Sequence, residues 1–481
     1  MVHSSQDLDH AEPQTAPAPN VPIDLIYGLD DRPPLPEAIF VALQHVLASF
    51  VGIITPPLII CGALEASPET TGYVVSMSLF ISGVATFIQC RKFGPLGSGL
   101  LSLQGTSFAF LGPIIGAGLA VTGAGQTPEQ ALALIFGLCF FGAFVEILLS
   151  RFLHLARKII TPVVSGTVVM IIGLSLIKVG ITSLGGGVIA QQNGTFGSYQ
   201  NLFLGGTVLA IIILLNMTGN RYLRMGAIAI GLAIGYAISL GLGLVDLSRL
   251  ASLPVLQLPI PFRFGMSFDF AAFVPFILLY LITAIETIGD LTATSAVSRQ
   301  PVSGSLYVKR IKGGVLGDGV NSLIAAVFNT FPNTTFSQNN GVIQMTGVGS
   351  RYVGFFVAGI FALLGLLPIV GGLFQSIPQP VLGGATLVMF GAIAVAGINI
   401  VASTEIDRRS LIIIAVSLGL GLGVVYVPEM MADKPALLRN IFSSGISTGG
   451  LTAILLNWLL PHDLGNPNLP VVTEEPEEST V

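Results

Sequence analysis

The chain has 481 residues, of which 52% are hydrophobic and only 9% are charged, and its net charge at pH 7 is −5. Because soluble domains carry about 25% charged residues, this composition excludes a soluble globular protein and predicts an integral membrane protein. A spanning helix needs about 20 mostly apolar residues, so the chain has room for well over ten of them.

The two ends of the chain are polar, unlike its interior. Residues 1–36 are rich in alanine and proline and have neither the basic region nor the apolar stretch of a signal peptide. Residues 462–481 are acidic and contain proline, which is typical of a disordered tail. We expect both ends to be cytoplasmic tails.

Fourteen apolar segments can be placed between these tails. Two of them, residues 100–121 and 333–347, are too polar or too short for ordinary spans. The segments cover residues 37–60, 72–90, 100–121, 130–150, 162–181, 201–217, 226–244, 270–289, 313–330, 333–347, 352–370, 380–401, 410–427 and 441–460.

The basic residues support this number of spans, because they collect in alternate connections. Arg91 and Lys92 lie between the second and third segments, for example, and Arg408 and Arg409 lie between the twelfth and thirteenth. Positive charges gather in cytoplasmic loops, so the alternation requires about fourteen spans with both termini cytoplasmic. The exceptions are Arg249, Arg263, Lys434 and Arg439.

The chain also contains an internal similarity. The sequence PVVSG at residues 162–166 recurs as PVLGG at residues 380–384, in the fifth and twelfth segments. A repeat of seven spans reverses its orientation in the membrane, and inverted repeats indicate a secondary transporter with its site at the repeat interface. The alternative is a chance likeness between two apolar helices rich in proline and glycine.

The same offset pairs the third segment with the tenth, and these are the two irregular segments. Residues 101–113 (LSLQGTSFAFLGP) and 333–347 (NTTFSQNNGVIQMTG) both combine β-forming residues, polar side chains and glycine. Broken segments at membrane depth occur where they are buried in protein or line a cavity. We therefore expect both to line a central site.

Ionisable side chains inside the predicted spans are few, and each is a candidate functional residue because its burial in lipid is costly. Glu286 and Asp290, at the end of the eighth segment, are four residues apart and share one helix face. A buried carboxyl group can exchange a proton when its surroundings change, so we favour a functional role for Glu286.

Structural alternatives exist for the other ionisable residues. Asp290 could cap or pair at the helix end, Asp318 could pair with a basic neighbour such as Lys312 or Arg310, and His45 could only orient its neighbours. Glu146 and Lys178 have the pattern of edge residues, and we assign them no role. The three cysteines, Cys61, Cys90 and Cys139, lack the spacing of a metal site or a disulfide, and we expect no metal and no cofactor.

The carboxamides Gln338, Asn339 and Asn340 indicate the class of substrate. Each offers a donor beside an acceptor, which is complementary to the adjacent N–H and C=O groups of a planar imide or lactam. Glu286 would accept further N–H groups, and Phe108 or Phe336 could stack on a flat ring. A small planar heterocycle fits this set, although the amides could instead satisfy only the broken backbone.

These motifs resemble the nucleobase–ascorbate transporter family, also called nucleobase/cation symporter-2. The resemblance rests on Gln338-Asn339-x-Gly341-x4-Thr346-Gly347, accompanied in order by QHVLA, GSGLLSLQGTSFAF, ETIGD and KGGVLGDG. It covers essentially the whole chain and is greatest for the bacterial xanthine permeases. Gly347 stands where many eukaryotic members have arginine, which fits a bacterial member.

The resemblance implies an all-α polytopic fold of two inverted seven-segment repeats, in which segments 3 and 10 are each a short strand plus a half-helix. It also implies a homodimer and two moving parts. The core domain would contain residues 37–158 and 246–370, and the gate domain residues 159–245 and 371–461.

The resemblance also implies roles for individual residues. Substrate binding would involve Glu286, Gln338, Ser107, Phe108, Ser337 and Asn339, whereas Asp318, His45 and Asp290 would organise the site or its proton coupling. Ser107 stands where some relatives restricted to xanthine have asparagine, so uric acid could also be accepted.

We therefore expect a proton-coupled symporter in a bacterial inner membrane that imports xanthine, and also uric acid, by an elevator mechanism. Its partners would be the purine, the proton, the lipid bilayer and a second copy, with no nucleic acid. One alternative is a permease for uracil or another nucleobase, and sodium coupling stays open. An anion transporter of the same fold should place positive charge at the midplane, and an intramembrane enzyme should have a nucleophile with a base or a metal cluster.

Overall fold

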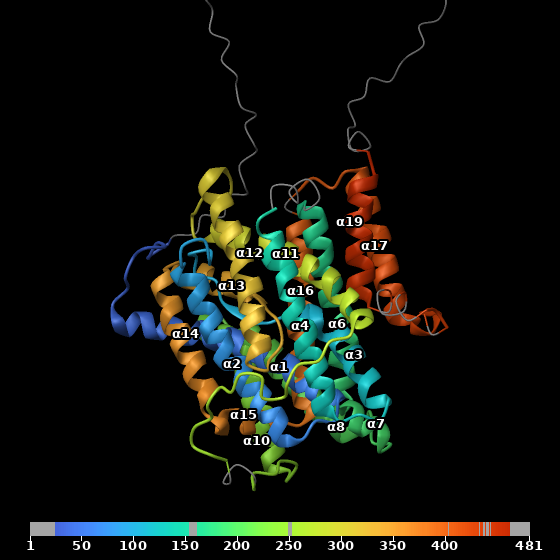
Figure 1. Ribbon diagram of the computed structural model, residues 1–481. Helices are drawn as coiled ribbons and strands as arrows, with labels where there is room; N and C mark the ends of the chain where they lie inside the picture. Colours follow the sequence, from blue (N-terminus) through green and yellow to red (C-terminus); the bar gives the residue numbers. More distant parts are fainter. Residues whose placement is uncertain are drawn as a thin grey trace, which may run out of the picture.

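The computed structural model describes residues 25–152, 161–248, 253–402, 404–431, 433–435, 438, 442 and 444–461. In these residues the regular structure is almost entirely helical (Figure 1), which confirms the all-α prediction. The helices are α1 (Leu35–Ala63), α2 (Pro68–Arg91), α3 (Leu111–Gly123), α4 (Pro128–Leu149), α6 (Pro162–Leu184), α7 (Gly187–Gln192), α8 (Tyr199–Met217), α9 (Arg221–Met225), α10 (Ala227–Gly241), α11 (Phe270–Val297), α12 (Gly304–Val327), α13 (Gln338–Thr346), α14 (Arg351–Leu366), α15 (Pro368–Gln375), α16 (Gln379–Ala402), α17 (Arg408–Tyr426) and α19 (Gly445–Leu459), with 3-10 turns η1 (Phe108–Phe110) and η3 (Pro428–Met431).

Local sequence signals begin several of these helices. The Thr127 hydroxyl accepts a hydrogen bond from the backbone N–H of Gln130, and the Gln130 side chain accepts one from the backbone N–H of Thr127. This capping box, followed by Pro128 in the first turn, fixes the start of α4. Ser67 caps α2 in the same way, since its hydroxyl accepts from the backbone N–H of Thr70 at 3.1 Å.

The two helices that carry the internal similarity, α6 and α16, lie antiparallel and in direct contact. A Cβ atom on Gly173 would lie 2.3 Å from the backbone nitrogen of Ala394, and one on Gly397 would lie 2.3 Å from that of Met170. Glycine at these positions therefore lets the two backbones touch. Antiparallel packing of the two similar helices is the arrangement that an inverted repeat produces.

The two irregular segments also meet. Strand β1 (Gln104–Thr106) pairs antiparallel with β2 (Asn333–Thr335), so that Gly105 is opposite Thr334. Two flanking bonds extend the pairing, from Ser107 N to Pro332 O at 2.8 Å and from Phe336 N to Leu103 O at 3.0 Å. Because β1 leads into η1 and α3, and β2 leads into α13, both segments are a short strand followed by a helix, as predicted.

Each predicted segment overlaps a helix or a strand–helix pair, yet fewer helices pass a test for spanning a membrane. In the described residues, eight helices are long and apolar enough by length and composition, or nine if the bent pair α14 and α15 (77°) counts as one span. The protein is therefore a multi-pass membrane protein, and the total of fourteen spans stays a prediction. The eight are α1, α2, α4, α6, α8, α11, α16 and α17.

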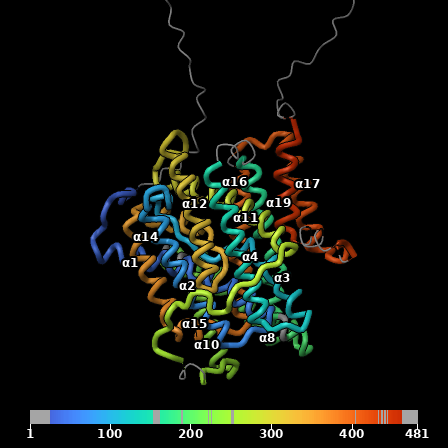
Figure 2. Tube along the Cα trace, in the orientation of Figure 1, coloured from blue at the N-terminus to red at the C-terminus, as the bar shows by residue number. Residues whose placement is uncertain are grey.

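Two groups of helices can be followed in Figures 1 and 2, where α2 and α14 lie on one side of the bundle and α17 and α19 on the other. In the first group α2 packs on α14, and α4 packs on α11 and α12. In the second, α6 packs on α16, and α17 packs on α19. The boundaries between core and gate domains stay a prediction.

Candidate functional site

Asp318 of α12 is completely buried and fully bonded. Its Oδ1 accepts a hydrogen bond from Nε2 of Gln89 at 2.7 Å, and its Oδ2 accepts one from the Thr287 hydroxyl. Neutral side chains from α2 and α11 thus satisfy this carboxyl group. The alternative that Asp318 pairs with Lys312 or Arg310 finds no support in these contacts.

One face of α11 holds the tenth segment in place. The Thr335 hydroxyl donates to Oδ2 of Asp290 at 3.1 Å, and the Thr294 hydroxyl donates to Oδ1 of Asn340 at 2.7 Å. Residues 287, 290 and 294 share this face, since they are three and four positions apart. The sequence predicts Asp290 at the end of a span, whereas α11 continues to Val297. Asp290 therefore lies inside the helix and anchors β2 rather than capping the helix end.

Glu286 and Gln338 differ from these bonded residues. The Glu286 carboxyl has a buried Oε2 without a hydrogen-bond partner among the described residues. Gln338, in the first turn of α13, is half-buried. Helices α11 and α13, which carry these two side chains, pack on each other.

The other residues expected to bind substrate lie around the crossing of the two broken segments. Ser107 is buried and its hydroxyl accepts from Ala109 N at 3.3 Å, so it caps η1. The Phe108 ring stands edge-on to Phe390 of α16, with the ring centroids 5.4 Å apart. Ser337 precedes α13, and its carbonyl accepts from Asn340 N at 3.0 Å. Broken segment 3 thus reaches toward α16 through Phe108.

Asn339 links the two broken segments. Its Nδ2 donates to the backbone carbonyl of Leu101, while its Oδ1 has no partner among the described residues. The Phe336 ring packs closely against Gly105 and Gly52. A Cβ atom on Gly105 would lie 2.3 Å from Cζ of the ring, and one on Gly52 would lie 2.8 Å from Cε2. Of the two phenylalanines considered for stacking, Phe108 is therefore the better candidate.

Two further residues, His45 and Gln89, bear on the site. His45 is completely buried, and neither ring nitrogen has a partner among the described residues. Gln89, which donates to Asp318, is a site residue that the sequence motifs did not indicate. The signal for it is a lone carboxamide just before the basic Arg91 and Lys92. No group of His, Cys, Asp and Glu side chains in the described residues could hold a metal ion.

Glu146 corrects an expectation, since it is no edge residue. Its side chain is only 1% exposed, and neither carboxylate oxygen has a hydrogen-bond partner among the described residues. The turn around it packs tightly on α12, because a Cβ atom on Gly319 would lie 2.8 Å from Ile147 N. Lys178, by contrast, is exposed and donates to the Val425 carbonyl at 3.3 Å.

Comparisons with known proteins agree with the resemblance in the motifs. A model described as a permease family matches residues 36–430. The chain is 53% identical over 439 residues to xanthine permease XanP of Escherichia coli (strain K12), covering 91% of this chain and 95% of that protein. It is 48% identical over 455 residues to xanthine permease XanQ of the same strain, covering 94% and 98%. It is 33% identical over 420 residues to uric acid permease PucJ of Bacillus subtilis (strain 168), covering 86% and 91%.

Solved structures with the same fold are more distant in sequence. The transmembrane domain of the cyanobacterial bicarbonate transporter BicA matches with a TM-score of 0.53 and 16% identity, covering 84% of this chain and 96% of that one. The murine Slc26a9 anion transporter in its inward-facing state matches with a TM-score of 0.56 and 11% identity, covering 89% and 69%. At these identities the likeness concerns the fold alone.

Proposed function

The chain belongs to the permease family of nucleobase–ascorbate transporters, and from this premise we propose that it is a proton-coupled symporter that imports xanthine and, as a second substrate, uric acid. As a permease it is a transporter and not an enzyme. The names of its relatives support a purine as the cargo, and the site supports a role for each polar group.

The observation that carries the proposal is the contrast between bonded and available polar groups. Asp290, Asp318 and Asn340 are bonded to the protein, whereas Oε2 of Glu286 lacks a partner among the described residues. A carboxylate is a pure acceptor, and a carboxamide such as that of Gln338 offers both a donor and an acceptor. Together they match a planar purine edge that carries adjacent N–H and C=O groups.

Proton coupling follows from the same carboxyl groups. Asp290 lies one turn after Glu286 on α11, and Asp318 accepts a hydrogen bond from Thr287, the residue that follows Glu286, so one protonation equilibrium in this set influences the others. We propose that a proton and a purine bind together from outside, and that the core helices then slide past the gate helices. Both ligands must favour the state that moves, because a ligand with equal affinity for two states shifts neither.

Alternative cargoes are less compatible with these residues. A small inorganic anion has no N–H group to donate to the carboxyl group of Glu286 and would meet it where positive charge is needed. Uracil or another nucleobase would fit the same hydrogen-bond pattern, and the relatives named as xanthine permeases favour a purine over it. The fold shared with bicarbonate and anion transporters does not decide between cargoes, since fold alone does not establish function.

A competition experiment tests this proposal. Uptake of labelled xanthine is measured in cells that express the chain and have no purine uptake of their own, with an excess of unlabelled xanthine, uric acid, hypoxanthine, guanine or uracil. We expect xanthine and uric acid to compete and uracil to have little effect. A protonophore should abolish accumulation, and replacement of sodium by choline should leave it unchanged. Absence of xanthine uptake, or stronger competition by uracil, would contradict the proposal.

We further propose that the transporter is a homodimer in a bacterial inner membrane, with both termini in the cytoplasm. The alternation of basic connections supports this orientation. Labelling of single cysteines introduced beside Arg91 and beside Glu129, on intact cells, tests it, since only the second should react with an impermeant reagent.

A further inference from the structure

A cavity with several basic lining residues lies outside the polar site just described. It has a volume of about 440 Å³ and forms where the loop after α2, the end of α4 and the first half of α12 meet. It is lined by Lys92, Gly94, Pro95, Ser150, Arg151, Lys309, Lys312, Gly313 and Leu316. We call it the basic pocket.

The charge of this basic pocket is entirely positive. Lys92, Arg151, Lys309 and Lys312 contribute four cationic side chains from three parts of the chain, and none of the lining residues is acidic. None of the four side chains forms an ion pair or a hydrogen bond with the part of the chain that the structure describes. Four unpaired cations around one cavity repel one another unless an anion lies between them.

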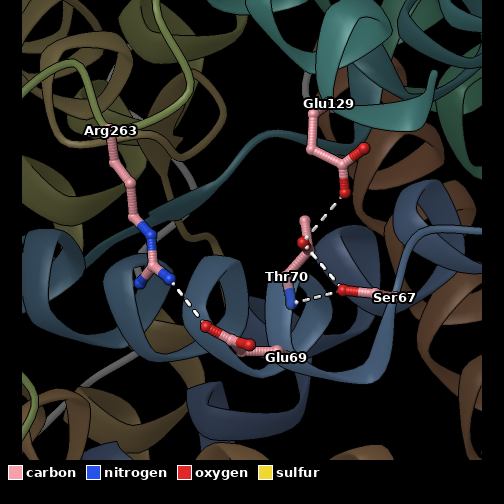
Figure 3. A network of polar contacts seen from close by, with 5 residues as sticks. All are labelled: Ser67, Glu69, Thr70, Glu129 and Arg263. Atoms are coloured by element: carbon pink, nitrogen blue, oxygen red, sulfur yellow. Dashed lines mark hydrogen bonds and ion pairs between the residues drawn. The ribbon is translucent and has the colours of Figure 1, made fainter.

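The other end of α2 shows the ordinary arrangement of a cation in this protein. Figure 3 shows Arg263 bonded to Glu69, and the two atoms, Nη2 and Oε1, are 2.9 Å apart. Beside this pair the Thr70 hydroxyl donates to Glu129 at the start of α4. Helix α2 has 24 residues, so the two ends are about 36 Å apart. At one end a carboxylate of α2 is paired with a cation, whereas the cations at the basic pocket have no ion-pair partner among the described residues.

The walls of the basic pocket are held in place by the backbone. Gly97 N donates to the carbonyl of Gly313 at 2.8 Å, and a Cβ atom on Gly313 would lie 2.4 Å from Gly97 O, so the loop lies directly on α12. Phe93 and Leu96 exchange two backbone hydrogen bonds across the turn. Lys92 itself has a φ of 59°, a left-handed conformation that is uncommon for lysine. The loop thus presents Lys92 in a fixed position.

Exposed apolar side chains surround these cations. Phe93 follows Lys92 and is 48% exposed, and Phe152 follows Arg151 and is 49% exposed. Leu306, one turn before Lys309, is also exposed. A free phosphate ion gains nothing from apolar neighbours. A phospholipid, by contrast, has acyl chains beside its charged headgroup that can pack against them. The predicted cytoplasmic side of the membrane is also where anionic headgroups attract basic residues.

We propose that the basic pocket binds the phosphate group of an anionic phospholipid, with the acyl chains against Phe93, Phe152 and Leu306. The lipid would join the loop after α2 to the ends of α4 and α12, and so brace the core helices at one membrane surface. This inference concerns a surface away from Glu286 and Gln338, and it stands whatever cargo those residues bind.

Lipid binding to the purified full chain tests the proposal. Native mass spectrometry measures the affinity for phosphatidylglycerol and for phosphatidylcholine, in detergent, for the wild type and for Lys309→Gln/Lys312→Gln. A basic residue near an anionic surface contributes about 1 kcal/mol, so we expect the double variant to lose about tenfold or more in affinity for phosphatidylglycerol. Its affinity for phosphatidylcholine should not change.

A control variant distinguishes lipid binding at the basic pocket from a general effect of positive charge on the protein. Arg224→Gln/Arg408→Gln removes the same charge from two exposed residues outside the pocket and should leave phosphatidylglycerol binding unchanged. Equal affinity of the wild type for the two lipids, or an equal loss in both double variants, would overturn the proposal. Inorganic phosphate is added in a further arm, and displacement of the lipid by phosphate at equal concentration would overturn the lipid as the source of the bound group.

Discussion

The two broken segments occupy equivalent places in the two halves of the chain, yet their chemistry differs. Strands β1 and β2 pair antiparallel at the centre, but the segment that contains β2 and α13 is polar and tied to α11 by Thr335 and Asn340. The segment that contains β1 and α3 is mostly apolar, and it packs through Phe108 and the flat surface of Gly105.

The difference shows that two segments with a similar backbone can form a site in which their side chains have different roles. The backbone of both interrupted segments is bonded, partly by strand pairing and partly by hydroxyl groups, since Gln104 N donates to Thr86 and Asn333 N donates to Ser322. The side chains are then free to diverge. In our account Gln338 of the tenth segment recognises the purine together with Glu286 of α11, and the third segment supplies the shape that limits its size.

The largest expected effect comes from the polar side of this comparison. Glu286→Gln removes the carboxylate that we propose binds the purine, and a hydrogen bond to a charged group is worth about 1.5–3 kcal/mol, so xanthine uptake should fall by about 10- to 100-fold. Glu129→Gln is the control, because Glu129 is a carboxyl group in the first turn of α4 that is bonded to Thr70 and not to a residue of the site. Uptake by the control should be unchanged, and normal uptake by Glu286→Gln would refute the assignment.

The second largest effect is expected from a substitution in the apolar third segment. Gly105→Ala would place Cβ 2.3 Å from the Phe336 ring, and overpacking of this kind costs about 1–3 kcal/mol. We expect a lower unfolding temperature in detergent, with partial recovery in Gly105→Ala/Phe336→Leu. Gly112→Ala, with open space around its Cβ atom, should not lower it. An unchanged unfolding temperature for Gly105→Ala would show that the two segments are not pressed together.

Proton coupling is expected to be more sensitive than binding to Asp318→Asn. Asparagine offers one acceptor oxygen where Asp318 accepts from both Gln89 and Thr287, so one of these donors loses its partner. Uphill accumulation of xanthine should decline, while exchange of internal for external xanthine persists. If the variant accumulates xanthine like the wild type and still loses it on addition of a protonophore, Asp318 has no part in coupling.

The smallest effect should be one of selectivity. Ser107→Asn adds bulk to the buried third segment, and a pocket discriminates by about tenfold or more for one additional group. Competition by uric acid should weaken while xanthine uptake is retained. Ser107→Ala separates bulk from hydrogen bonding, since it should keep both substrates. Equal competition by uric acid in Ser107→Asn and the wild type would show that the third segment does not limit size.

Much of this comparison could be predicted from the sequence, because it depends on which residues are polar in an apolar chain. The carboxamides of residues 338–340 and the carboxyl group of Glu286 stand out for this reason, and the paired broken segments follow from their common offset. The sequence could not divide these polar residues into bonded and available ones. That division depends on distant partners, such as Gln89 for Asp318 and Thr294 for Asn340.

The burial of individual residues is the second property that the sequence could not predict. Glu146 lies near the end of its segment, and periodicity alone cannot tell a helix end that faces solvent from one that packs between α11 and α12. The length of α11 was underestimated for a similar reason, since residues 291–297 are less apolar than the rest of the helix but are still packed. The core and gate boundaries, the homodimer and the coupling ion stay predictions.

Binding and stability measured together on two neighbouring amides test the central claim most directly. Xanthine binding to the purified chain and its unfolding temperature are compared for Gln338→Ala and Asn340→Ala. If Gln338 recognises the purine and Asn340 holds the segment on Thr294, the first variant loses binding at an unchanged unfolding temperature. The second unfolds at a lower temperature but binds xanthine while folded. Loss of stability in Gln338→Ala with intact binding, or loss of binding alone in Asn340→Ala, would contradict the account.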